Sequence, residues 1–129
     1  MQKLSAKNQE SGFTLVEIIV VIAILGILLA IAIPVYINQR KEAWKASVRE
    51  DITNSVLIVE RDQSLNGYYQ AYASAPPNAK LSANVSLKVS VLPAVSGNTA
   101  CVEAFNTLSP TDTLFHYNIS QRKLLSGGC

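Results

Sequence analysis

The sequence has few of the residues on which most enzymes and metalloproteins depend. It contains one histidine, His116, and two cysteines, Cys101 and Cys129, in 129 residues. A hydrolytic triad needs a base such as histidine, and His116 is the only histidine that could supply it. A zinc site needs three or four ligands, so two cysteines and a distant histidine do not predict one. No glycine-rich phosphate-binding loop occurs. We therefore expect no enzymatic activity, no metal and no cofactor.

An excess of charge of one sign is also lacking. Eleven basic residues face nine acidic ones, and the formal net charge is +2. A balance so close to neutral gives no argument for a nucleic-acid partner. Three tyrosines cluster at Tyr68, Tyr69 and Tyr72, but no basic stripe accompanies them as base stacking would require. The length fits one modest domain, and no direct binding of nucleic acid is expected.

The sequence does contain one long uncharged apolar run. From Ile18 to Ile37, 20 residues carry no charge, and only Gly26 and Pro34 fall outside the apolar and aromatic types. As an α-helix such a run rises about 30 Å, which matches the hydrocarbon core of a bilayer. It predicts a helix that inserts into a membrane. Pro34 lacks an N–H and predicts a kink, and Gly26 lowers helix propensity by up to about 1 kcal/mol.

Three interpretations of this run compete. A secretory signal peptide has an apolar region of roughly 7–15 residues and ends at a small-residue cleavage site, neither of which is found here. A plain transmembrane anchor fits the length, but Glu17 at the edge of the run costs a few kcal/mol near hydrocarbon. A helix that leaves the membrane to form a filament core recovers this cost if Glu17 pairs with a cation on a neighbouring subunit. A free amine on Phe13 would be such a cation, so Glu17 favours the third interpretation.

A close resemblance to the type IV pilin and pseudopilin family is carried by residues 11–17, SGFTLVE, and continues to Tyr36. It implies that a prepilin peptidase and methyltransferase cuts between Gly12 and Phe13 and methylates the new amine of Phe13. It also implies that Glu17, five residues into the product, pairs with the Phe13 amine of an adjacent subunit.

Gly26 and Pro34 fall at places that the family uses, and the resemblance implies that this stretch unwinds when the subunit enters the filament. Residues 38–55 resemble, more loosely, pilins of Gram-positive high-GC bacteria. The partners implied are further copies of the chain in a helical homopolymer, the pilus assembly platform with its ATPase, and the membrane before assembly. The implied location is a single-pass membrane protein with its C-terminus outside, and later an extracellular pilus. The charges that flank the apolar run barely discriminate between orientations.

The helical pattern continues beyond the apolar run as an amphipathic segment. Its apolar positions recur at spacings of four and three, at Trp44, Val48, Ile52, Val56 and Val59. The other faces are expected to carry the charged residues Arg40, Lys41, Arg49, Glu50 and Asp51. Asn66-Gly67 predicts the C-terminal cap, because glycine tolerates a positive φ. One helix of roughly 50 residues, bent at Pro34, is expected.

The remainder of the chain is expected to form a loop and a sheet. Turn formers and Pro76-Pro77 predict a loop over 66–84 that covers the helix and the sheet edge. Strict alternation predicts a strand at 85–91, and turn residues predict a turn at 96–98. Further strands are predicted at 99–105, 114–119 and 123–125. His116 is expected to face solvent, because its apolar neighbours take the other side of its strand.

These elements predict an α+β protein: a long bent N-terminal helix packed on a small antiparallel sheet of three to four strands, which is the pilin fold that the resemblance implies. Four parts are expected along the chain. They are a leader at 1–12, a transmembrane and filament-core helix at 13–37, its amphipathic continuation at 38–65, and a globular part at 66–129.

The cysteines alone leave two possibilities open, one disulfide or two unrelated thiols. A disulfide commonly joins the C-terminal region of the family's subunits, so the resemblance implies a bond between Cys101 and Cys129. It would close a loop of 29 residues, counting both ends, and stabilise the fold by about 3.5 kcal/mol.

The function expected is that of a structural subunit, a major pilin, of a type IV pilus. One alternative is a pseudopilin of a type II secretion or competence fibre, which shares the N-terminal helix. The other is a membrane-anchored binding module that never polymerises, against which Glu17 argues.

Overall fold

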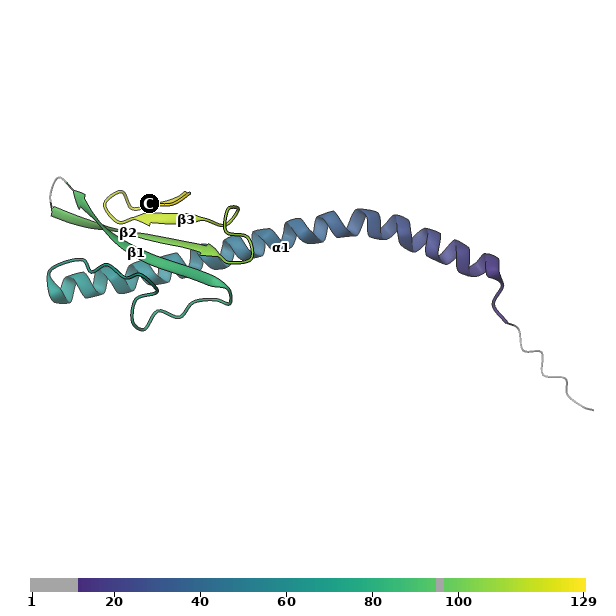
Figure 1. Ribbon diagram of the computed structural model, residues 1–129, viewed down its shortest axis with the longest axis horizontal. Helices are drawn as coiled ribbons and strands as arrows, with labels where there is room; N and C mark the ends of the chain where they lie inside the picture. The colour runs from purple at the N-terminus through teal and green to yellow at the C-terminus, as the bar shows by residue number, and fades with distance from the viewer. Residues whose placement is uncertain (1–11, 95–96) are drawn as a thin grey trace, which may run out of the picture. The chain divides into compact units, whose positions relative to one another are not determined.

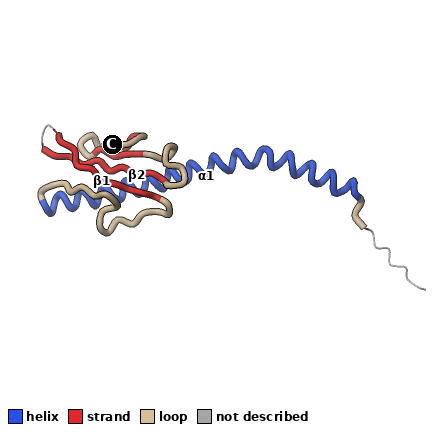
Figure 2. The backbone as a smooth tube through the Cα atoms, viewed as in Figure 1, coloured by secondary structure: helices blue, strands red, loops and turns tan. Residues whose placement is uncertain are grey.

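The computed structural model describes residues 12–94 and 97–129; most of the expected leader lies outside these residues. One helix is followed by four strands (Figure 1). Helix α1 spans Leu15–Asn66, and the strands are β1 Val85–Ala94, β2 Gly97–Asn106, β3 Phe115–Asn118 and β4 Lys123–Ser126. This is the α+β architecture that the sequence predicts. The tan segments in Figure 2 are the loops that join these elements.

The chain divides into two compact units between Ile37 and Asn38. Within the first unit, residues 15–37 are helical and all are exposed. The large apolar side chains from Phe13 to Ile37 are 48–84% exposed. Helix α1 is long and apolar enough to cross a membrane. Among residues 12–37, therefore, no apolar core covers these side chains.

Within the second unit, α1 buries one face against the sheet. Val48, Ile52 and Val59 are at most 1% exposed, and Val56 is 5% exposed. These are the positions predicted from the spacing of apolar residues. Trp44 is only half-buried, and the Arg40 guanidinium lies 4.9 Å from the centre of its ring. The helix ends one residue beyond the predicted end, where Gly67 has a φ of 81° and its N–H donates to the carbonyl of Gln63 at 2.7 Å.

The sheet is an antiparallel meander in the order β1-β2-β3-β4, as predicted. Its inner face carries Leu87 and Val89 from β1, Ala100, Val102 and Ala104 from β2, and Phe115 from β3. Because strand residues alternate between faces, Cys101, Glu103 and His116 lie on the opposite, outer face. Ile119 and the α1 face complete one continuous core.

The strand boundaries differ most from the prediction where β1 ends and β2 begins. The expected turn at 96–98 is wrong at Gly97 and Asn98, which pair with Ala94 and Pro93 within the β1–β2 ladder; Ser96 lies outside the described residues. Pro93 lies in β1 although it cannot donate a ladder hydrogen bond. This is tolerated because β1 is an edge strand.

The loop between α1 and β1 is held at two points. Tyr72 forms an isolated antiparallel bridge with Val89, with backbone N···O distances of 2.8 and 2.9 Å. The Asp51 carboxylate accepts hydrogen bonds from the Ser82 N–H at 2.8 Å and from the Ser82 hydroxyl at 3.1 Å. The prediction that Asp51 lies on a charged outer face is therefore wrong. It is 4% exposed, because it satisfies polar groups of the loop that covers it.

Candidate processing and assembly site

The first turn of α1 is closed by Thr14 and Glu17. The Glu17 carboxylate accepts the Thr14 N–H at 2.8 Å and the Thr14 hydroxyl at 3.1 Å. In return, the Glu17 N–H donates to Thr14 Oγ1 at 3.2 Å. This is a capping box, in which two otherwise unpaired donors at a helix start are satisfied reciprocally. The sequence carries the signature of a capping box, Thr followed three residues later by Glu, but this motif was not among the predicted features.

The capping box fixes where the Glu17 carboxylate points. It lies beside the backbone N–H of Thr14, one residue after Phe13. The N-terminus of a helix also carries partial positive charge, which favours an anion there. The exposed carboxylate is therefore held at the N-terminal end of α1, just before the apolar run begins.

The predicted cleavage point, Gly12-Phe13, lies just before α1. Both residues are exposed and have no regular secondary structure. Phe13 is 84% exposed, and apart from the adjoining residues no atom of the described chain lies within 4 Å of the position that a Gly12 Cβ would occupy. The bond between Gly12 and Phe13 is therefore exposed and lies outside the helix.

Gly26 and Pro34 both lie inside α1, which is helical through both positions. Pro34 has no N–H to donate to the carbonyl four residues earlier. At Gly26 no neighbouring atom lies within 4 Å of the place that a Cβ would take, so no packing contact requires glycine there. The kink and the unwinding predicted for this stretch stay predictions.

On the outer face of the sheet, Cys101 and Cys129 are joined by a disulfide with a Cα–Cα distance of 6.2 Å. This is the pair that the resemblance implied. Next to it, Glu103 stands between Lys88 on β1 and His116 on β3. Glu103 accepts the Cys129 N–H at 2.8 Å and lies 3.2 Å from Lys88 Nζ.

His116 does not face solvent as predicted. It is half-buried, and its Nδ1 lies 2.9 Å from the Gly127 carbonyl oxygen. Residues 127–129 cover this part of the outer face, which periodicity within the strand does not reveal. Partial burial acts to raise the pKa of Glu103, but the Cys129 N–H and Lys88 outweigh it and hold that pKa below its ordinary value.

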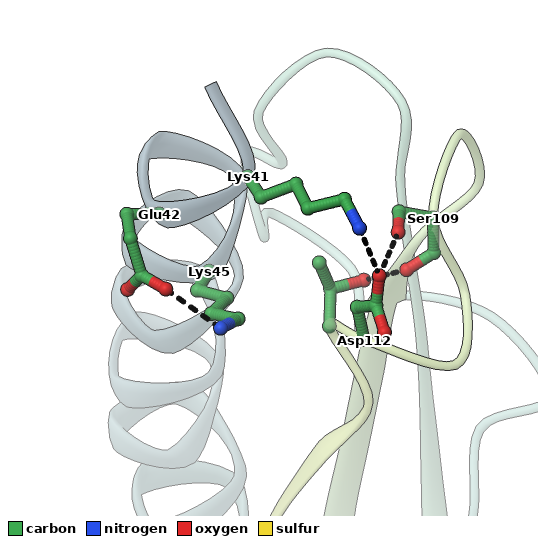
Figure 3. A network of polar contacts seen from close by, with 6 residues as sticks. Lys41, Glu42, Lys45, Ser109 and Asp112 are labelled. Carbon is green, nitrogen blue, oxygen red and sulfur yellow. Dashed lines mark hydrogen bonds and ion pairs between the residues drawn. The ribbon is translucent and has the colours of Figure 1, made fainter. Parts of the chain in front are cut away.

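A second polar cluster links α1 to the loop between β2 and β3 (Figure 3). Lys41 Nζ lies 2.9 Å from Asp112 Oδ2, and the Ser109 hydroxyl donates to the same oxygen at 3.1 Å. Lys45 turns instead to Glu42 on the same helix, at 2.7 Å. The hydrogen bond from Lys41 is the main cause that holds the pKa of Asp112 below its ordinary value. Across residues 12–94 and 97–129, no group of three metal-ligating side chains comes together.

The chain carries a known N-terminal motif. The family model described as the prokaryotic N-terminal methylation motif matches residues 7–33, which include Gly12, Phe13 and Glu17. Together with the long helix and the antiparallel sheet, this motif is consistent with the pilin fold. The chain is similar to proteins named as type IV pilins and to a type II secretion core protein. Type IV pilins are structural proteins, not enzymes.

Three relatives illustrate the similarity. The chain is 34% identical over 70 residues to the type IV major pilin protein PilE1 of Neisseria gonorrhoeae, over 54% of this chain and 38% of that protein. The fimbrial protein of Neisseria meningitidis is also 34% identical over 70 residues, which cover 54% of this chain and 37% of that protein. The type II secretion system core protein G of Pseudomonas aeruginosa is 44% identical over 46 residues, which cover 36% of this chain and 32% of that protein. Each match spans less than two fifths of the relative's length, and no solved structure matches significantly.

Proposed function

We propose that this chain is a structural subunit, the major pilin, of an extracellular type IV pilus. The observation that carries the proposal is the exposed apolar surface of residues 13–37, most of which lies within the methylation motif. Such a surface is not stable in water and needs lipid or other subunits around it. A bilayer covers it first, and the helices of neighbouring subunits cover it in the filament.

Processing begins at the exposed bond between Gly12 and Phe13. A separate prepilin peptidase hydrolyses this bond and releases residues 1–12, and the same enzyme methylates the Phe13 amine. Because α1 begins only at Leu15, the peptidase meets non-helical backbone. The product keeps its apolar helix, unlike a secreted protein whose signal peptide is removed.

Assembly then uses the Glu17 carboxylate. In the single chain this carboxylate caps its own helix through Thr14. The ammonium on Phe13 of an adjacent subunit is a stronger partner than a neutral N–H, because it carries a full positive charge and forms an ion pair with the carboxylate. Pairing with that ammonium offsets the cost of burying the carboxylate among apolar helices.

The role of Glu17 is tested by comparing two substitutions. Glu17→Gln keeps an oxygen that accepts the Thr14 N–H but removes the charge, whereas Glu17→Ala removes both. If the carboxylate pairs with an amine, both variants stay in the membrane as stable protein and form few or no filaments. If Glu17→Gln assembles at the normal level, capping alone explains Glu17 and the intersubunit pair is wrong.

Gly26 and Pro34 bound the stretch of α1 that we propose unwinds as the subunit enters the filament. A residue without an N–H and a residue of low helix propensity weaken the helix at these two points. Replacing both by alanine strengthens the helix and is expected to reduce filament yield while leaving membrane insertion unchanged. Unaltered filament yield would show that the unwinding is not needed.

Before assembly, the chain is a single-pass membrane protein with its C-terminus outside. Its partners are further copies of the chain, the prepilin peptidase and methyltransferase, and the assembly platform with its ATPase. The proposal includes no nucleic-acid partner for the subunit itself.

The N-terminal mass of material sheared from the cell surface tests the whole proposal. A chain that begins at N-methylated Phe13 and dominates the preparation is the expected result. A protein that stays in the membrane with Met1 intact would contradict it and favour a membrane-anchored binding module that never polymerises.

A pseudopilin of a type II secretion or competence fibre is the second candidate. The identity of 44% to a type II secretion core protein over 46 residues favours it. Deletion of the gene distinguishes the two functions. Loss of surface filaments with normal secretion and DNA uptake supports the pilin, whereas loss of either process without loss of surface filaments supports the pseudopilin.

A further inference from the structure

We propose that oxidation of the disulfide enters at Cys129, and that Glu103 is the positioning residue that docks Cys129 so that Cys101 completes the bond. The proposal concerns the second unit alone and does not depend on whether the chain forms a filament. It rests on the contacts between residues 127–129 and the outer face of the sheet.

The docking contacts are separate from the sulfur–sulfur bond. Glu103 lies two residues after Cys101 on β2, so both side chains leave the same face of the sheet. Its Oε2 accepts the Cys129 N–H at 2.8 Å, and its Oε1 is held 3.2 Å from Lys88 Nζ. Cys129 is thereby fixed by its backbone beside Cys101.

Residue Gly127 is docked as well. Its carbonyl oxygen lies 2.9 Å from His116 Nδ1, and its N–H donates to the Leu114 carbonyl at 2.8 Å. Lys88, Glu103 and His116 are cross-strand neighbours in one row over β1, β2 and β3. This row is a polar site built for the segment that carries Cys129.

The two cysteines differ in access. Cys101 is 1% exposed, whereas Cys129 is an exposed residue. An oxidising disulfide therefore reaches Cys129 first. The Cys129 thiolate attacks one sulfur of that donor, a sulfur–sulfur bond forms between them, and the donor's other sulfur leaves as a thiolate.

The second step is intramolecular. The Cys101 thiolate attacks the Cys129 sulfur, the bond between Cys129 and the donor breaks, and the donor's remaining sulfur leaves as a thiolate. The protein loses two electrons and the donor disulfide gains them. Docking by Glu103 raises the effective concentration of Cys129 at Cys101 and so accelerates this step but not the first.

The experiment uses the full chain, reduced, in detergent micelles, with glutathione disulfide as the donor. Aliquots are quenched by alkylation, and mass spectrometry separates the reduced, mixed-disulfide and closed forms. With single cysteines, Cys101→Ser, which leaves Cys129, is expected to form the mixed disulfide at least about tenfold faster than Cys129→Ser.

Glu103→Ala is expected to form the mixed disulfide at the normal rate and to close it about tenfold more slowly. Tenfold corresponds to about 1.4 kcal/mol, the order of one hydrogen bond to a charged group. Glu103→Gln retains an acceptor oxygen and is expected to restore part of the rate. Asp112→Ala, which removes a carboxylate from a different ion pair, is expected to close normally.

A second variant tests the same contact from the other side. A Cβ on Gly128 would lie 2.9 Å from Glu103 Oε2, so Gly128→Ala displaces the carboxylate without altering any strand. It is also expected to slow closure only, even if Glu103→Ala fails to fold. Normal closure in both Glu103→Ala and Gly128→Ala would overturn the positioning role, and faster reaction of Cys101 than of Cys129 would overturn the proposed order.

Discussion

Lys41 and Asp112 are 71 residues apart in the chain, yet Lys41 Nζ lies 2.9 Å from Asp112 Oδ2. This ion pair joins α1 to the loop between β2 and β3. The loop is also braced internally, because the Thr113 hydroxyl donates to the Ser109 carbonyl at 2.6 Å and accepts the Asn106 N–H at 2.8 Å. The ion pair therefore adds an attachment to a loop that already has its own hydrogen bonds.

We predict that Lys41→Ala leaves the midpoint of urea unfolding unchanged but raises hydrogen exchange at residues 107–113. The two side chains are 43% and 46% exposed, and exposed ion pairs add little to stability. Lys45→Ala, which removes a pair within α1, serves as the control and leaves exchange in the loop unchanged. A large fall in the unfolding midpoint for Lys41→Ala would contradict this account.

The centre of the core contributes more to the free energy of unfolding than this ion pair does. Ile52 is fully buried, and Ile52→Ala is expected to lower the free energy of unfolding by about 2–5 kcal/mol through lost burial and a cavity. Ile52→Val is expected to cost about 0.5–1.5 kcal/mol. Leu57, 62% exposed on the same helix, is the matched control, with a change within about 0.5 kcal/mol on mutation to alanine. Urea unfolding with the disulfide intact measures all three.

Asp51 anchors the loop between α1 and β1 through Ser82. Asp51→Ala removes the acceptor for both the N–H and the hydroxyl of Ser82, so we expect a loss of about 1.5–3 kcal/mol. Asp51→Asn keeps one acceptor oxygen and is expected to lose less. Hydrogen exchange at the Ser82 amide should rise more in Asp51→Ala than in Asp51→Asn. Equal stability of the alanine variant and the unmodified protein would show that the loop is held by its bridge to β1 alone.

Glu103 gives the stability a dependence on pH. Its pKa in the folded protein lies below the ordinary value of 4.5, so the carboxylate stabilises the fold fully above that value. This stabilisation is lost as the pH falls through the lowered pKa. Unfolding midpoints measured from pH 6 downward should therefore fall more steeply for the unmodified protein than for Glu103→Gln. Parallel curves would mean that Glu103 titrates alike in the folded and unfolded states.

The sequence predicts α1 and the order of the strands because both rest on local periodicity. Val48, Ile52, Val56 and Val59 repeat at helical spacing, and residues 85–91 of β1 alternate strictly, so the buried faces follow from residue type. The capping box of Thr14 and Glu17 was equally local and could have been predicted. Its spacing is visible in the sequence, although only the structure gives the direction of the carboxylate.

Features formed between distant segments were not predictable in this way. Asp51 is buried because of Ser82, which lies 31 residues away, and no pattern around Asp51 signals that partner. His116 is half-buried because residues 127–129 return over its strand, whereas alternation within β3 indicates only which face it occupies. Polar contacts of this kind depend on where loops return, and single-sequence periodicity carries no information about that.

The sheet order also has a kinetic consequence. Each strand pairs with the strand that follows it in synthesis, so every new pairing closes only a short loop and costs little chain entropy. Proteins built from such local pairings fold faster than those that need distant segments to meet. The sheet can therefore grow strand by strand as the chain emerges from the ribosome or the membrane. The link between Cys101 and Cys129 reaches from β2 past β3 and β4, so it closes a longer loop than any pairing between neighbouring strands and adds a long-range constraint to the described sheet.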